Sequence, residues 1–180
     1  PSSERSPCDV SALLAFSEWQ LKHYAQANIA AETGKDLYER AGLQTKRRDY
    51  GMLLILRGLV KHSQAFERYQ EERAKGFLKI ETAERLGQAM AEALDNIDEI
   101  NARLGKDEPV VIYANRQQLL ISDNILHVWV DTQQADTPQP ELVRRHRCEW
   151  SAKGMRLWQE RFPQEYAIKN EVDQLHEGIK

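Results

Sequence analysis

Apolar and polar positions alternate most regularly between residues 110 and 131, in the segment VVIYANRQQLLISDNILHVWVD. Two-residue turns at Asn115-Arg116 and Asp123-Asn124 divide this segment into three strands of similar length: 110–114, 117–122 and 125–131. In an antiparallel meander with this register, side chains alternate between the two faces, and one face is entirely apolar. That face holds Val110, Ile112, Leu119, Ile121, Leu126, Val128 and Val130. We therefore predict a three-stranded sheet over 109–132, packed on helices through this face.

A helix over the same residues is the alternative. The stretch 116–120 contains good helix formers, and neither turn has a glycine. Strands are favoured instead by the β-branched and aromatic residues Val110, Val111, Ile112, Tyr113, Ile125, Val128, Trp129 and Val130. The strand interpretation predicts an α+β fold that is mainly α, whereas the helical alternative predicts an all-α bundle.

The rest of the chain has apolar residues at helical spacing. The first such segment predicts a helix over 7–33, with Ser6 as its N-cap and Gly34 as its stop. Its apolar positions are Val10, Leu14, Leu21 and Tyr24, widened by Leu13, Phe16 and Trp19. A short helix over 36–41 is expected to follow and to end at Gly42.

A long helix is predicted from Thr45 to about Lys75. Its middle is apolar nearly all round, which is typical of a central, buried helix. Gly51 and Gly58 within it each cost about 1 kcal/mol relative to alanine, so we expect them to permit close approach of a neighbouring helix. The next segment, which ends at Gly105, has a heptad seam typical of a bundle helix. The seam consists of Leu86, Met90, Ala93, Ile97, Ile100 and Leu104.

After a loop over 136–140, two further helices are expected, over 140–161 and 163–178. No internal repeat and no composition shift divides the chain, so we expect a single domain over 1–180. Its predicted parts are a helical bundle over 7–105, the sheet over 109–132 and C-terminal helices over 140–178.

The 180 residues carry 25 Lys and Arg against 28 Asp and Glu, a net charge of −3, so no global field attracts the protein to nucleic acid or to an anionic membrane. No apolar run approaches the roughly 18–20 residues needed to cross a bilayer, so we expect a soluble protein that does not enter membranes. The first ten residues contain no signal-peptide core, which predicts a cytoplasmic location. The chain begins at Pro1 rather than at a methionine, which leaves room for a preceding leader and makes that location provisional.

Residues that usually carry cofactor, metal or redox chemistry are sparse. Cys8 and Cys148 could pair only if the first helix packs beside the late one, and two unrelated thiols are the preferred interpretation. Three pairs lack companions at metal-ligand spacing: His127 with Asp131, His146 with Cys148, and Asp173 with His176. There is no phosphate-binding glycine loop and no GxSxG elbow. We therefore predict no metal and no cofactor, and favour a protein that is not an enzyme.

Arg57 and His62 are separated by four residues within the long predicted helix. This spacing resembles the Arg-x4-His signature of HEPN-type ribonucleases, helical proteins in which the arginine and histidine cleave RNA without a metal, commonly at a dimer interface. The resemblance covers six residues and implies proton transfer by His62 and stabilisation of phosphate charge by Arg57. In a regular helix the two side chains lie about 140° apart, so the alternative is a surface arginine and a partly buried histidine.

Two basic clusters suggest nucleic-acid contact as a further possibility. They consist of Lys46, Arg47 and Arg48, and of Arg144, Arg145 and Arg147. Trp150 and Trp158 lie near the second cluster and could stack on bases. Consecutive residues spread around a helix, however, and salt bridges to the acidic side of the helix before Gly105 explain these clusters equally well.

The reverse face of the predicted sheet offers a surface for a partner, because exposed aromatic and aliphatic side chains concentrate binding energy. It carries Leu120, Ile125, His127 and Trp129. The alternative is that the C-terminal helices cover this face. The function predicted from the sequence is a non-enzymatic adaptor, regulator or inhibitor that binds a protein partner or itself; RNA or DNA binding, or HEPN-like RNA cleavage, is the alternative.

Overall fold

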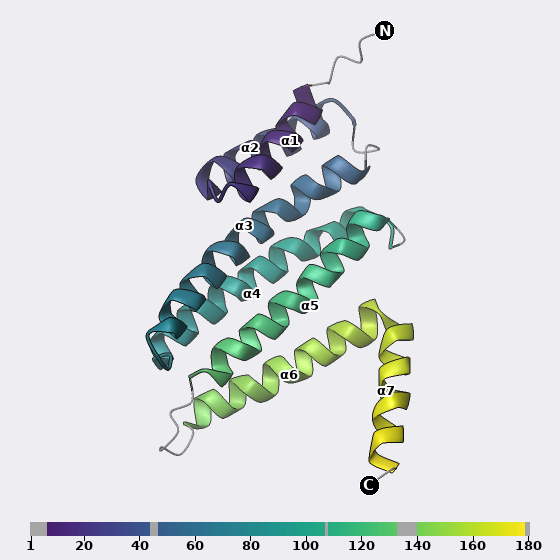
Figure 1. The fold of residues 1–180 in the computed structure, drawn as a ribbon. Helices are drawn as coiled ribbons and strands as arrows, with labels where there is room; N and C mark the ends of the chain where they lie inside the picture. Colours follow the sequence, from purple (N-terminus) through teal and green to yellow (C-terminus); the bar gives the residue numbers. More distant parts are fainter. Residues whose placement is uncertain (1–6, 44–46, 107, 133–139, 179–180) are drawn as a thin grey trace.

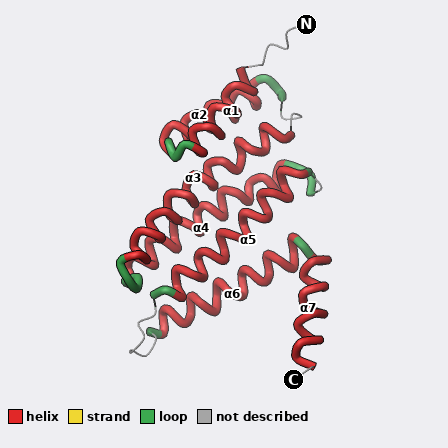
Figure 2. The backbone as a smooth tube through the Cα atoms, in the orientation of Figure 1, coloured by secondary structure: helices red, strands yellow, loops and turns green. Residues whose placement is uncertain are grey.

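The computed structural model describes residues 7–43, 47–106, 108–132 and 140–178, and in these ranges every regular element is a helix (Figures 1 and 2). The helices are α1 (Pro7–Gln20), α2 (Tyr24–Arg40), α3 (Arg47–Ala74), α4 (Ile80–Arg103), α5 (Pro109–Val130), α6 (Glu141–Arg161) and α7 (Pro163–Gly178).

From α1 to α6, successive helices run in opposite directions and pack side by side in chain order (Figure 1). The α1–α2 hairpin packs on α3, α3 packs on both α4 and α5, and α5 packs on α4 and α6. Helix α7 contacts α6 and turns away from the array. As a result α1, α3 and α5 share one direction, and their N-terminal ends lie at the same end of the molecule.

Helix α3 is the centre of the array, as its apolar middle predicts. Residues 53–56 and 59–60 are at most 3% exposed, and among residues 53–60 Arg57 alone is exposed. Gly58 allows α4 to approach, because a Cβ at this position would lie 2.5 Å from Ile97 Cγ1 and 2.7 Å from the carbonyl oxygen of Ala93. The predicted close approach at Gly58 is confirmed.

The heptad seam predicted before Gly105 is the buried face of α4. Its members from Leu86 to Ile100 are at most 3% exposed, and α4 ends at Arg103, close to the predicted stop. The two C-terminal helices also begin where proline predicts: Pro140 is the N-cap of α6, and Pro163 is the first residue of α7. None of the helices in the described ranges is both long enough and apolar enough to cross a bilayer.

The prediction of a β-meander over 109–132 is wrong, and the predicted α+β fold class is therefore wrong as well. Residues 109–130 form the single helix α5, drawn red throughout in Figure 2. Ile112, placed on the apolar sheet face, is 44% exposed, whereas Gln118, placed on the opposite face, is completely buried. The all-helical alternative is the arrangement found.

The apolar residues of α5 fit both the two-residue period of a strand and the 3.6-residue period of a helix, and for this reason the strand prediction was wrong. The innermost residues of α5 are spaced by three and four positions, as on one side of a helix. They are Val111, Ala114, Gln118, Ile121, Ile125 and Val128, each at most 1% exposed. Neighbouring α3, α4 and α6 bury this helix, and burial outweighs a β propensity whose whole range is about 1 kcal/mol. Asn115 and Asn124, expected in exposed turns, are buried within the helix.

The predicted first helix over 7–33 is in fact two helices. The chain leaves α1 after Gln20 and reverses through Lys22, whose positive φ of 64° is uncommon for a residue other than glycine. Gly34 does not end a helix; it lies buried inside α2, where an added Cβ would be 3.1 Å from Leu53 Cδ1. The short helix expected over 36–41 is the last part of α2, and Gly42 follows it with φ of +65°. The predicted Ser6 cap lies outside the described residues.

Candidate protein-docking groove

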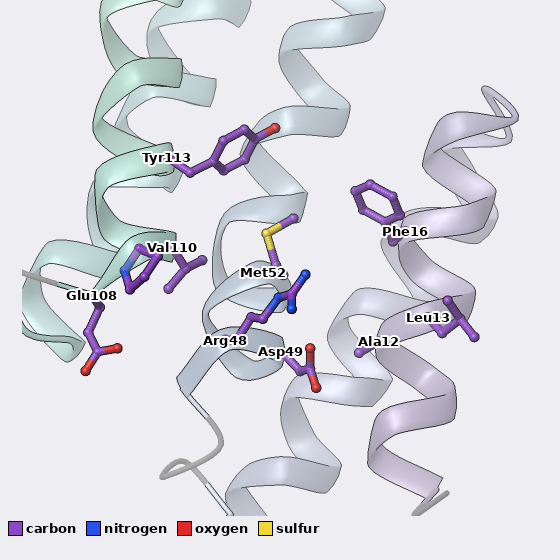
Figure 3. A pocket seen from close by; sticks show the side chains of 10 residues that line it. Ala12, Leu13, Phe16, Arg48, Asp49, Met52, Glu108, Val110 and Tyr113 are labelled. Carbon is purple, nitrogen blue, oxygen red and sulfur yellow. The ribbon is translucent and has the colours of Figure 1, made fainter.

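A groove of about 930 Å³ lies where α1, α3 and α5 meet, close to the N-terminal ends of α3 and α5 (Figure 3). We call it the α1–α3–α5 groove. It is lined by Ala12, Leu13 and Phe16 of α1, by Arg48, Asp49 and Met52 of α3, and by Glu108, Pro109, Val110 and Tyr113 at the start of α5.

The middle of the groove is apolar. In Figure 3, Phe16 on α1 and Tyr113 on α5 project toward the space above Met52 of α3. Phe16 is 39% exposed and Leu13 is 51% exposed, so the wall formed by α1 is open to solvent. An open depression with large apolar side chains on its wall is typical of surfaces that bind another macromolecule.

Charged groups lie at the end of the groove where α3 and α5 begin. Arg48 and Asp49 come from the first turn of α3, and Glu108 is the N-cap residue of α5. Burial raises the pKa of the Tyr113 phenol above its ordinary value, so this side chain stays neutral at physiological pH. The groove therefore has an apolar middle and a charged end of mixed sign.

The outer side of α1, next to the groove, is also apolar. Val10, Leu13 and Leu14 lie within about one turn of one another on α1 and are 50%, 51% and 49% exposed, and Leu21, which is 63% exposed, follows in the turn after α1. We call these four residues the α1 ridge. Between residues 10 and 21, Glu18 is the only charged residue in the sequence, and it pairs with His23 at 2.7 Å. Leu13 belongs to both the ridge and the groove.

Hydrogen bonds hold the α1–α2 hairpin on α3. Trp19 of α1 donates its indole N–H to Ser63 Oγ at 3.0 Å. Beyond the turn, the Tyr24 hydroxyl donates to Glu67 at 2.9 Å, and Lys22 pairs with the same carboxylate at 2.6 Å. Burial and the neighbouring Glu67 carboxylate raise the pKa of Tyr24 to about 12, so its hydroxyl remains a donor. These contacts fix the α1 wall of the groove.

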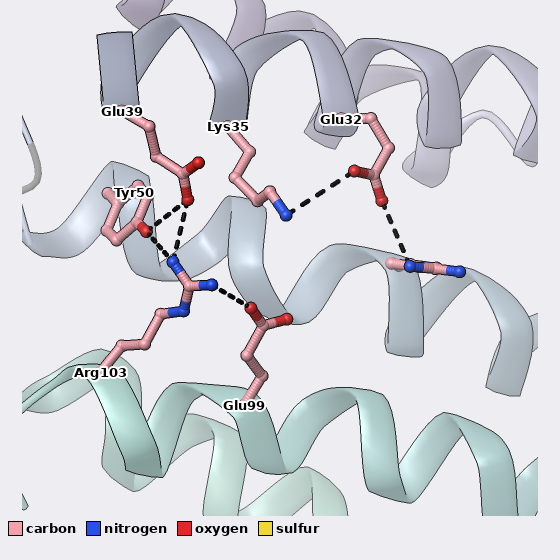
Figure 4. A network of polar contacts seen from close by, with 7 residues as sticks. Glu32, Lys35, Glu39, Tyr50, Glu99 and Arg103 are labelled. Atoms are coloured by element: carbon pink, nitrogen blue, oxygen red, sulfur yellow. Dashed lines mark hydrogen bonds and ion pairs between the residues drawn. The ribbon is translucent and has the colours of Figure 1, made fainter. Parts of the chain in front are cut away.

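A second polar network fixes the first turns of α3 (Figure 4). The Tyr50 hydroxyl donates to the Glu39 carboxylate of α2 at 3.0 Å, and Arg103 of α4 donates to both groups at 2.9 Å. Glu99 also pairs with Arg103, at 2.8 Å. Because Tyr50 lies between Arg48 and Met52 in sequence, this network holds the floor of the groove in place.

The structure points Arg57 and His62 toward different helices. Arg57 is exposed and reaches Glu32 of α2 at 3.7 Å. His62 is 8% exposed, and its Nε2 lies 3.0 Å from the amide nitrogen of Asn124 on α5. Burial lowers the pKa of His62 to about 4. Within one chain these two side chains therefore do not face a common phosphate site.

The four residues assigned to a partner surface do not share a face. Leu120 is 48% exposed, and the His127 side chain is exposed as well, 3.5 Å from Asp123. Ile125 is completely buried and Trp129 is 2% exposed. The Trp129 indole stacks on the His146 ring of α6, with centroids 4.2 Å apart and planes at 11°. The structure therefore has no such surface, because Ile125 and Trp129 belong to the core while Leu120 and His127 are exposed.

The basic clusters are also spread out. Lys46 and the side chain of Arg47 lie outside the described residues, whereas Arg48 is exposed at the groove. Three other residues share the first turns of α6: Arg144 pairs with Glu141, Arg145 is exposed, and Arg147 is half-buried.

The tryptophans near the second cluster do not offer open faces to bases. Trp150 is 9% exposed beneath Lys153, whose Nζ lies 4.6 Å from the ring centroid, and Trp158 packs against Tyr166 at 6.2 Å. The described side chains thus do not combine exposed cations with exposed aromatic rings at this end of α6.

Metal and thiol chemistry has little support among the described side chains. They contain no group of three metal-ligating residues, and Cys148 is an exposed free thiol on α6. The side chain of Cys8, the other half of the pairing considered from the sequence, lies outside the described residues.

The sequence prediction missed the groove, although it did name several of its residues. Leu13 and Phe16 were interpreted only as widening an apolar stripe, and Val110 was assigned to a sheet. One feature of the sequence could have indicated the groove: α1 has more large apolar residues than one buried side of a short helix needs.

No protein-family model, curated protein or solved structure matches this chain. The case for a function therefore depends on the geometry of the chain itself.

Proposed function

We propose that this protein is a non-enzymatic interaction protein that binds a helical segment of a protein partner in the α1–α3–α5 groove. The observation that carries the proposal is the open apolar wall of α1, with Leu13 and Phe16 exposed beside the half-buried Met52 and Tyr113. A groove between helices that is lined by large apolar side chains suits the apolar face of an amphipathic helix, which inserts residues spaced by three and four positions.

The arrangement of the groove walls favours a helical segment as the occupant. These walls, α1 and α5, run in the same direction on either side of α3. A helix laid between them can pack against residues 12–16 of α1 and 109–113 of α5 with its polar side in solvent. The charged end formed by Arg48, Asp49 and Glu108 can then fix the orientation of the segment.

The proposal is tested by photocrosslinking from the wall of the groove. A photoreactive phenylalanine analogue replaces Leu13 in one variant, and replaces the exposed Ile29 of α2, which does not line the groove, in a matched control. We expect irradiation in cells to give a discrete protein adduct from position 13 and none from position 29. Adding Phe16→Asp should abolish the adduct. Absence of any adduct from position 13, or equal adducts from both positions, would contradict the proposed function.

A further inference from the structure

The α1 ridge and the α1–α3–α5 groove lie side by side on one face of the molecule. The ridge is convex, because its four side chains are exposed on α1 and on the turn that follows it, and the groove is concave. Leu13 stands at the boundary between them. A surface that carries a projection and a matching depression next to each other can pack on a copy of itself around a two-fold axis.

We propose that a second copy of this chain is the occupant of the groove, with the α1 ridge of each protomer inserted into the groove of the other. The inference rests on the proposed function, because it names the partner of that same groove. In this arrangement Leu13 lies nearest the two-fold axis, and Val10 and Leu14 of one protomer pack toward Phe16 and Met52 of its partner.

The charge distribution favours self-association through this face. Between positions 10 and 21 the only charged residue in the sequence is Glu18, and its carboxylate pairs with His23 at 2.7 Å, so this part of α1 brings little unpaired charge to a contact with its own copy. The outward face of α4 is different. Helix α4 exposes Glu81, Glu84 and Asp95, so pairing this face with its own copy would bring like charges together.

The distribution of exposed apolar side chains points to the same face. Outside α1 and Leu21, the large exposed ones among the described side chains occur one or two to an element: Ile29, Phe77, Ile112, Leu120, Met155 and Ile168. Scattered side chains of this kind are normal on a protein surface. On α1 they are contiguous, and their exposed parts amount to roughly 300 Å² in each protomer.

That area suits a modest dimer. With the lining of the groove added on both sides, the interface lies below the about 1,200–2,000 Å² that standard protein interfaces bury in total, in the range of weak and transient contacts. We therefore expect a dissociation constant in the micromolar range and a mass that depends on concentration.

The first experiment is sedimentation equilibrium of the purified chain from about 1 to 200 µM, a range that spans such a dissociation constant. We expect the wild type to shift from monomer to dimer. Leu13→Glu should weaken the dimer about 100-fold, because it places a carboxylate at the apolar centre of the interface. The matched control Ile29→Glu should leave dimerisation unchanged within about twofold. Circular dichroism should show the same helix content for all three proteins, since both substituted positions are more than half exposed.

A second experiment tests the two-fold arrangement itself. Leu13→Glu and Leu13→Lys should each be monomeric alone and should form a heterodimer when mixed, because opposite charges then meet near the axis. A wild type that stays monomeric throughout the concentration range, or a dimer that Leu13→Glu does not weaken, overturns the proposal. So does a mixture that fails to associate.

The photocrosslinking experiment separates this inference from the proposed function. An adduct from position 13 with twice the mass of the chain, containing only its own peptides, supports the second copy. An adduct that contains another protein, together with a monomeric wild type, overturns the second copy while the docking function stands. Absence of any adduct contradicts both.

Discussion

Burial of His62 links the stability of the helical array to pH. The histidine lies between α3 and α5 beside Asn124, and burial lowers its pKa from 6.5 to about 4. Between these two values the unfolded chain therefore holds more protons than the folded chain. The contribution of His62 to stability is complete above about pH 6.5 and is lost as the pH falls through 4, a total on the order of 3 kcal/mol.

A His62→Gln variant isolates this effect, because glutamine can still meet the Asn124 amide but does not titrate near neutral pH. Between pH 7 and pH 5 we expect the wild type to lose about 2 kcal/mol more unfolding free energy than the variant. Urea denaturation at a series of pH values measures the difference. Parallel pH profiles for the two proteins would show that His62 is not protected from protonation.

Trp129 was predicted on an exposed surface, but the structure places it in the core. Alternation along a strand placed it on a half-polar face beside Ile125. In the helix both side chains point into the core, and the Trp129 indole stacks on His146. Its burial could not be recognised from its own chemistry, because tryptophan is common both in cores and at interfaces.

Trp129→Glu is therefore expected to damage the fold rather than a partner interaction. Losing the buried ring and burying a carboxylate should cost about 4 kcal/mol or more of unfolding free energy. Leu120→Glu, one of the other residues proposed for the partner surface, should cost less than about 1 kcal/mol, because Leu120 is 48% exposed. Thermal unfolding followed by circular dichroism compares the two. Equal melting temperatures would contradict the placement of Trp129 in the core.

At the scale of the elements, the sequence predicted best those helices that have a proline at their start or a regular apolar seam. Helices α6 and α7 begin at or beside a proline, and α4 has an unbroken heptad seam. The missed break in the first segment has no such signal, since Lys22 adopts its positive φ without a glycine. Helix α5 was missed for another reason. Its sequence fits both a strand and a helix, and burial by the neighbouring helices, which the local sequence does not show, favours the helix.

Two glycines test how closely the elements pack. Alanine normally stabilises a helix by about 0.5–1 kcal/mol relative to glycine. Gly58→Ala should instead destabilise the protein by about 1–3 kcal/mol, because the new methyl group would collide with the backbone oxygen of Ala93 on α4. Gly154→Ala on α6 is the matched control: its Cβ would lie 3.4 Å from Ser122 Oγ, at ordinary contact distance. Urea denaturation should therefore give opposite signs for the two variants, and a stabilising Gly58→Ala would contradict the close approach.

At the scale of the whole molecule, the helices form an open array instead of a closed bundle. Among the described residues, α1 and α2 contact α3, whereas α6 and α7 are joined to the array through α5. The α1–α3–α5 groove is a product of this openness, because it lies where three helices of one side meet without a further helix to cover them. Such a site depends on which helices are neighbours, so residue patterns within single segments could not have predicted it.

Packing in chain order also has a consequence for how the protein reaches its fold. The helix pairs with substantial contact are all one or two helices apart in the chain, so the fold contains few contacts between segments that are distant in sequence. Contacts between near neighbours in sequence close quickly, since short loops cost little entropy. We therefore expect the chain to fold helix by helix as it leaves the ribosome, with α3 buried only after α5 has emerged.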